Sequence, residues 1–197
     1  CDAVLLTNEE NLRYFCGYRS AAWNSEYEYP AMMLVARSGK IALVTSTRRL
    51  PGALATACVE ETEILAFDGF GEQATPGVFA PSIVQALQQL GVTSGKLGTE
   101  TGLVARMRIT YSDYQALFAL MPDMQAMDFA KYIFDLREIK SPREIEVMRK
   151  CCAMSVDAFK VGMDKLVLGS TTEEEMYHEY VAACFDMGAD DFEYQLI

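Results

Sequence analysis

The stretch Leu136-Arg137-Glu138-Ile139-Lys140-Ser141-Pro142-Arg143-Glu144-Ile145 decides how the chain is organised. Ser141 and Glu144 have the spacing of a capping box, in which the hydroxyl accepts from a free helix amide and the carboxylate accepts from the Ser141 amide. Pro142 takes the first helical position, where its missing N–H costs no hydrogen bond. The sequence therefore predicts that a long helix begins here and that two folded units meet within this stretch.

Residues 1–136 alternate between strand-like and helical patterns. Short apolar runs predict buried strands, and apolar residues every three or four positions predict helices. The predicted strands cover residues 2–7, 31–36, 40–46, 63–67, 96–100 and 124–127, and the predicted helices cover 8–15, 81–90, 111–121 and 129–136. Arg37-Ser38-Gly39 joins two of the strands as a hairpin, which makes the sheet mixed. We therefore expect an α/β domain with a mixed sheet flanked by helices.

Residues 137–197 are predicted to be helical. The first helix has an apolar stripe at three- and four-residue spacing, formed by Ile145, Met148, Cys152, Val156, Phe159 and Met163. Thr172 and Glu175 form a second capping box, and the helix that follows it ends at Gly188. Its stripe consists of Met176, Tyr180, Ala183, Cys184 and Met187. Two helices cannot bury both stripes alone, so we expect apolar surface that this chain barely covers.

Composition excludes two classes of partner. The formal net charge is -11 and the isoelectric point is about 4.6, so a phosphate backbone would be repelled and nucleic-acid binding is disfavoured. No apolar run reaches the ~18 residues of a membrane span, so we expect no membrane partner. The six cysteines lack C-x-x-C spacing, which favours reduced, mostly buried thiols in a cytoplasmic protein. They are Cys1, Cys16, Cys58, Cys151, Cys152 and Cys184.

The only histidine, His178, lacks the neighbours that metal or nucleophilic chemistry needs. A zinc-protease helix motif would place a second histidine at position 182, which is Ala182. Cys184 lies six residues on, about 240° around a helix, so the two side chains diverge. We therefore expect neither a metal ligand nor a catalytic pair here.

Three other segments have a chemical and a structural interpretation. Residues 69–74 resemble the start of a dinucleotide loop but lack the third small residue in register, which favours an ordinary loop. Asp190-Asp191 favours a solvated loop over a cation site. The segment 21–30 is rich in aromatic side chains, which suit either a ligand wall or interface, or a roof over the domain's own core. The aromatic residues in question are Trp23, Tyr27 and Tyr29.

Two motifs in order resemble one enzyme family. The first is Asp2-Ala3-Val4-Leu5-Leu6-Thr7-Asn8-x-x-Asn11-Leu12-Arg13-Tyr14-Phe15-x-Gly17-Tyr18. The second is Arg137-x-x-Lys140-Ser141-Pro142-x-Glu144-Ile145, at the right distance downstream. Together they resemble the creatinase, prolidase and aminopeptidase P family. The resemblance implies an amino-terminal mixed-sheet domain without catalytic residues over 1–136. It also implies that 137–197 begin a catalytic domain of the pita-bread fold.

In that family the pita-bread domain binds two divalent metal ions (manganese, cobalt or zinc) through two aspartates, a histidine and two glutamates. None of these five ligands has a matching position here, because the sequence stops at Ile197 after two helices of that domain. We therefore expect part of a longer enzyme, with no catalytic or metal-binding residue in this chain and no activity of its own.

The resemblance further implies a homodimer and a small peptide or other small-molecule substrate. The segment with Trp23, Tyr27 and Tyr29 matches a substrate-proximal loop by position. The expected role is dimerisation and substrate gating in a dimetal Xaa-Pro peptidase. Open alternatives are a creatinase, a lyase acting on a small zwitterion, and a metal-free binding module.

Overall fold

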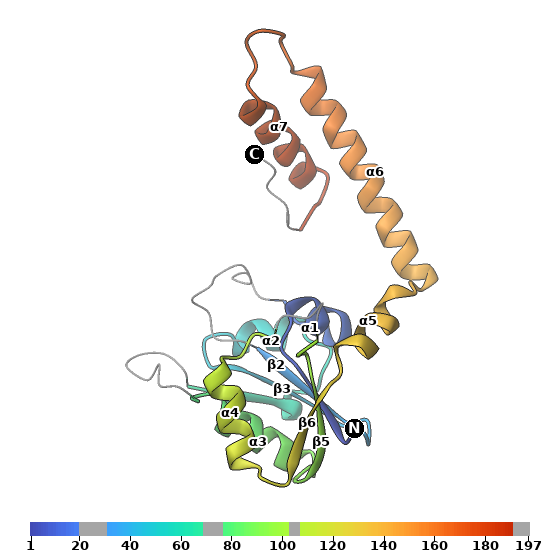
Figure 1. The fold of residues 1–197 in the computed structure, drawn as a ribbon. Helices are drawn as coiled ribbons and strands as arrows, with labels where there is room; N and C mark the ends of the chain where they lie inside the picture. The colour runs from blue at the N-terminus through green and yellow to red at the C-terminus, as the bar shows by residue number, and fades with distance from the viewer. Residues whose placement is uncertain (20–30, 69–76, 103–106, 191–197) are drawn as a thin grey trace. The chain divides into compact units, whose positions relative to one another are not determined.

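The computed structural model describes residues 1–19, 31–68, 77–102 and 107–190. The chain divides into two compact units, a first unit of Cys1–Leu136 and a second unit of Arg137–Ile197. Figure 1 shows a sheet covered by helices in the first unit, and the helices of the second unit.

The first unit is built on a six-stranded sheet with the order β4-β3-β2-β1-β5-β6. β1 pairs in parallel with β5 and antiparallel with β2, and β2 is antiparallel to both of its neighbours. The remaining pairs, β3 with β4 and β5 with β6, are parallel. The predicted mixed sheet is thereby confirmed. The strands are β1 (Ala3–Leu6), β2 (Met32–Ala36), β3 (Ile41–Ser46), β4 (Ile64–Phe67), β5 (Gly95–Thr99) and β6 (Met124–Asp128).

Helices cover both faces of this sheet (Figure 1). α3 (Ala80–Gln89) and α4 (Tyr111–Leu120) pack on one face, and α1 (Glu9–Cys16), α2 (Leu50–Thr56) and α5 (Ala130–Glu138) pack on the other. β1 shows why two layers form. Ala3 and Leu5 belong to the core under α3 and α4, whereas Leu6 belongs to the core under α1, because alternate residues of a strand point to opposite faces.

The structure adds two elements that the sequence patterns did not predict, α2 and the 3-10 turn Glu61–Glu63. The α2 sequence Leu50-Pro51-Gly52-Ala53 has turn-forming residues in its first turn, and no side chain caps the helix. The helix is held by packing, since Ala53 is fully buried against the sheet. Tertiary contact has therefore overridden weak local propensity.

The described part of the second unit contains the end of α5 and two further helices, α6 (Pro142–Asp164) and α7 (Glu173–Asp186). Both predicted capping boxes are present, with Ser141 bonded reciprocally to Glu144 and Thr172 bonded reciprocally to Glu175. These hydrogen bonds lower the pKa of both glutamates, chiefly through the Ser141 side chain at Glu144 and the Thr172 backbone at Glu175.

Small residues form the contact between α6 and α7. Ala158, Ala183 and Cys184 are buried there, and a Cβ on Gly162 would lie 3.3 Å from the Met176 carbonyl oxygen. Most of the predicted stripe of α6 lies outside this contact, with Ile145 37% and Val156 55% exposed. Phe159 is 51% exposed, and its ring meets the Tyr180 ring of α7 edge-on with 6.4 Å between the centroids. The apolar surface expected from the sequence is thus present. No helix within the described residues is long and apolar enough to cross a bilayer.

Candidate functional site

A buried polar cluster lies at the carboxyl ends of the parallel neighbours β1 and β5. Thr7 follows β1 and Glu100 follows β5, and the paired register Leu5 with Thr99 brings them together. We call Thr7, Asn8, Asn11 and Glu100 the Glu100 cluster. Ligands of open α/β sheets usually bind at this edge, so polar side chains that lie here are candidates for a binding site.

Four donors converge on the Glu100 carboxylate. Its Oε2 accepts from the Thr7 amide at 2.5 Å, the Thr7 hydroxyl at 3.0 Å and the Asn8 amide at 2.9 Å. Its Oε1 accepts from the Asn11 side-chain amide. Glu100 is only 1% exposed, and burying an ionised carboxylate requires this many partners.

The geometry of the Glu100 cluster suits bracing rather than proton transfer. Both carboxylate oxygens are occupied by groups of the protein itself. Asn8 also caps α1, since its Oδ1 accepts from the Glu10 amide at 3.3 Å. The Thr7-Asn8-x-x-Asn11 part of the first motif therefore encodes the attachment of α1 to β5. The sequence patterns did not single out Glu100, although a carboxylate directly after a buried strand was an available signal.

Arg108 extends this cluster toward solvent. Its backbone amide donates to the Thr7 hydroxyl at 2.8 Å, and its guanidinium pairs with the Glu9 carboxylate at 3.0 Å. The Arg108 side chain is 40% exposed, so the pair is a surface pair of small energetic value. It holds the segment before α4 against the start of α1.

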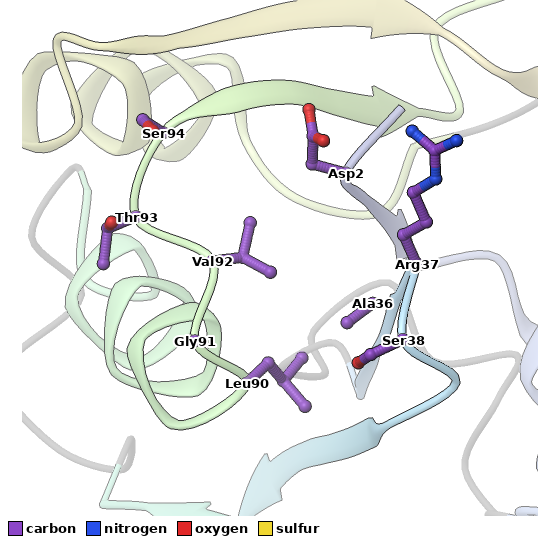
Figure 2. Close-up of a pocket in the computed structure, with 9 residues that line it drawn as sticks. All are labelled: Asp2, Ala36, Arg37, Ser38, Leu90, Gly91, Val92, Thr93 and Ser94. Carbon is purple, nitrogen blue, oxygen red and sulfur yellow. The ribbon is translucent and has the colours of Figure 1, made fainter.

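A shallow polar pocket of about 280 Å³ lies at the opposite ends of β1 and β5, lined by Asp2, Arg37, Thr93 and Ser94 among others. Figure 2 shows Asp2 and Arg37 side by side at one edge, across from Thr93 and Ser94. The Asp2 Oδ2 atom accepts from the Lys96 amide at 2.7 Å, and a Cβ on Gly95 would lie 2.3 Å from it. The Asp2 side chain therefore links the start of β1 to the start of β5, and only glycine fits beside it at position 95.

A second pocket, of about 440 Å³, is mainly apolar. It lies between the sheet and α5, where Val4, Phe15, Ile133 and Leu136 are among the lining residues. A hollow of this character can hold an apolar side chain, but it lacks the converging polar groups of a reaction site.

The predicted site residues fall into two groups. Trp23, Tyr27 and Tyr29, together with residues 69–74 and Asp191, lie outside the described residues, so their predicted roles stay predictions. His178 is exposed on α7 whereas Cys184 is buried against α6, so the structure does not bring these two together.

The cysteine prediction is wrong in one respect. All six thiols are free, but only Cys16 and Cys184 are buried, and the other four are exposed. The error arose because Cys is treated as a small hydrophobe in sequence patterns. Cys151 and Cys152 lie on a helix whose partner surface is small.

Within the described residues, no three His, Cys, Asp or Glu side chains form a group that could hold a metal ion.

A family model for the Creatinase/Prolidase N-terminal domain matches residues 1–139. The chain belongs to this family. The resemblance seen in the two sequence motifs is thereby confirmed, and the match ends close to the start of α6. No curated protein sequence is similar enough to count as a match.

Solved structures share the fold. An X-Pro aminopeptidase from Thermotoga maritima MSB8 is 18% identical, with a TM-score of 0.72, and the match covers 96% of this chain and 47% of that one. A prolidase from Pyrococcus horikoshii OT3 is 18% identical, with a TM-score of 0.68 and coverage of 96% and 45%. A proline dipeptidase from Streptococcus pneumoniae is 15% identical, with a TM-score of 0.53 and coverage of 71% and 88%. The chain thus spans about half the length of the first two structures.

Proposed function

We propose that this chain is the amino-terminal part of a metal-dependent Xaa-Pro peptidase. The observation that carries the proposal is the family match over residues 1–139, together with a fold shared over 96% of the chain with an X-Pro aminopeptidase and a prolidase. In this proposal residues 1–136 are the amino-terminal domain, and residues 137–197 begin the catalytic pita-bread domain. The boundary between the two compact units, which lies between Leu136 and Arg137 in the sequence, supports that division.

In this proposal the metal-dependent chemistry is carried by a part of the protein other than residues 1–197. A pair of manganese, cobalt or zinc ions held there would polarise the scissile carbonyl and provide a hydroxide at neutral pH. The exposed apolar stripe of α6 supports the proposal that a larger catalytic domain begins with these helices. Met148, Val156 and Phe159 are about half exposed, which leaves apolar surface on α6 that a larger domain would cover.

The role proposed for the chain itself is dimerisation and substrate gating in a cytoplasmic homodimer that acts on small peptides. The segment with Trp23, Tyr27 and Tyr29 follows α1 and is rich in side chains that form ligand walls. The acidic net charge of -11 supports a small-molecule or peptide substrate over a nucleic acid.

An activity assay tests the peptidase proposal. Residues 1–197 and the complete reading frame of the source gene are purified and given an Xaa-Pro dipeptide with manganese. We expect cleavage by the complete protein and none by residues 1–197. Turnover by residues 1–197 would contradict the proposed location of the active site. Turnover of creatine, or elimination from a small zwitterion, by the complete protein would instead favour the non-peptidase relatives. A complete protein with no turnover and no metal would favour a binding module.

Two further measurements test dimerisation and gating. Sedimentation equilibrium of residues 1–197 should give the mass of a dimer, whereas a monomer at all concentrations would place dimerisation elsewhere. In the complete enzyme, Trp23→Ala should change KM for peptides longer than a dipeptide more than KM for the dipeptide. Equal changes would contradict gating. Tyr14→Ala, which changes an exposed aromatic residue of α1, is the control.

A further inference from the structure

Two cysteines that are distant in sequence lie side by side in the first unit. Cys16 is the last residue of α1, and Cys58 follows α2. The Cys58 amide donates to the Cys16 carbonyl oxygen at 2.7 Å. Standard bond lengths across such a hydrogen bond hold the two Cα atoms within about 6 Å of each other. Disulfides join Cα atoms that are about 4.4–6.8 Å apart, so the backbone spacing fits one.

Both sulfur atoms lie against the same turn. The Cys16 Sγ donates to the Leu12 carbonyl oxygen at 3.1 Å, and the Cys58 Sγ is 3.4 Å from the position that a Cβ on Gly17 would take. Gly17 has φ +71°, the left-handed conformation that ends α1. Because residue 17 has no side chain, no Cβ stands between the turn and the Cys58 sulfur.

The two thiols differ in reactivity. Cys58 is exposed and Cys16 is 2% exposed. Burial raises the pKa of the Cys16 thiol, the Tyr18 backbone amide lowers it, and the neighbouring Cys58 raises it. Cys16 therefore remains a thiol at neutral pH, whereas Cys58 meets solvent oxidants first.

We propose that Cys58 and Cys16 form a redox-modification site, in which Cys58 reacts with a peroxide and Cys16 resolves the product into a disulfide. The Cys58 thiolate attacks one oxygen of hydrogen peroxide, the O–O bond breaks, and the departing hydroxide takes up a proton to give water and a sulfenic acid. The Cys16 sulfur then attacks the Cys58 sulfur, the S–O bond breaks, and the hydroxide leaves with the Cys16 proton as a second water. Two thiols lose two electrons, and one peroxide gains them.

The disulfide would join the end of α1 to the residues after α2. This junction already contains a hydrogen bond from the Arg19 amide to the Thr56 hydroxyl at 3.0 Å. Arg19 is the last described residue before the segment with Trp23. Oxidation would therefore add a covalent link beside this hydrogen bond. The inference rests on the cysteine geometry alone and does not require the proposed peptidase function.

Peptide mapping of residues 1–197 tests the site. The reduced protein is treated with hydrogen peroxide at one to several equivalents, and the remaining thiols are then blocked after denaturation. We expect a cross-linked peptide pair containing Cys16 and Cys58, with the mass of two hydrogen atoms lost, and its release by dithiothreitol. Peroxide that converts Cys58 to a sulfinic or sulfonic acid while Cys16 stays alkylatable would overturn the proposal.

Variants separate this pair from the other thiols. A Cys1→Ser, Cys151→Ser, Cys152→Ser protein lacks the remaining exposed thiols and should form the disulfide to the same extent. Loss of the cross-link in that protein would overturn the proposal. Cys58→Ser changes an exposed residue and should leave Cys16 fully alkylatable after the same treatment. Oxidation of Cys16 in Cys58→Ser to the wild-type extent would also overturn it.

Discussion

Removing the Glu100 carboxylate should destabilise the first unit more than any single surface change. Glu100→Ala deletes the acceptor for the Thr7 amide, the Asn8 amide and the Asn11 side chain at once. The Thr7 amide and the Asn11 side chain are buried, so neither can turn to water in place of the lost carboxylate. Glu61→Ala, at an exposed position on the 3-10 turn, serves as the control.

The magnitude follows from the donors that are left unpaired. The Thr7 hydroxyl can rotate, the Asn8 amide is only partly buried, and the Asn11 side chain has a further interaction, so these three are left out of the estimate. The buried Thr7 amide then costs about 1–3 kcal/mol, because a buried polar group without a partner loses its hydration as well. We expect a loss of about 1–3 kcal/mol, against about 5–15 kcal/mol for the whole stability of a domain. The melting temperature should fall by roughly 3–15 °C in a domain of this size.

Denaturant unfolding followed by circular dichroism measures the loss, and hydrogen exchange locates it. In Glu100→Ala the amides of Thr7 and Asn8 should exchange faster, while amides of β3 change only with the global stability. Glu61→Ala should stay within about 0.5 kcal/mol of the parent. A loss below about 1 kcal/mol in Glu100→Ala, with Thr7 and Asn8 still protected, would show that the carboxylate does not brace α1.

Two further changes have a defined direction. Gly98→Ala places a Cβ 2.9 Å from the Phe129 Cβ and should cost about 1–3 kcal/mol in urea unfolding, whereas Gly52→Ala on α2 meets only an atom at 3.8 Å and should be neutral or stabilising. Equal effects would contradict the packing argument. Acid should weaken the capping boxes, because the pKa values of Glu144 and Glu175 are lowered in the folded protein. The ionised carboxylates therefore stabilise the helices fully above pH ~4.3, the ordinary pKa of glutamate. This stabilisation is lost as the pH falls through the lowered pKa values of the folded state. Glutamine at both positions keeps the hydrogen-bond acceptor but does not titrate. The double variant should therefore lose less helical circular dichroism signal than the parent between pH ~5 and ~2. An acid transition identical to that of the parent would contradict this.

Local signals account for the elements that the sequence predicted well. The capping boxes at Ser141 and Thr172 and the turn at Gly39 depend on a few neighbouring residues, and all three occur as expected. The short apolar runs of β1 to β3 also sufficed, because strands that are buried on both faces are apolar along most of their length. Such elements need no information from distant parts of the chain.

Distant contacts account for what the patterns missed. α2 has poor helix formers in its first turn and exists because Ala53 packs on the sheet. The role of Glu100 depends on Thr7, 93 positions away in sequence, so only the parallel pairing of β1 with β5 reveals it. Cys58 and Cys16 likewise meet only after α1 and α2 have packed on the same face. Spacing in the sequence could predict none of these three.

The motifs that reveal the family therefore encode architecture rather than chemistry. Thr7 and Asn11 hold a buried carboxylate, Asn8 caps α1, and Ser141 caps α6. At 15–18% identity to the compared structures, most positions differ. Cores tolerate many substitutions of similar size, but a buried carboxylate tolerates no loss of its donors. The first motif thus contains Thr7, Asn8 and Asn11 as residues whose hydrogen bonds attach α1 to the residue after β5.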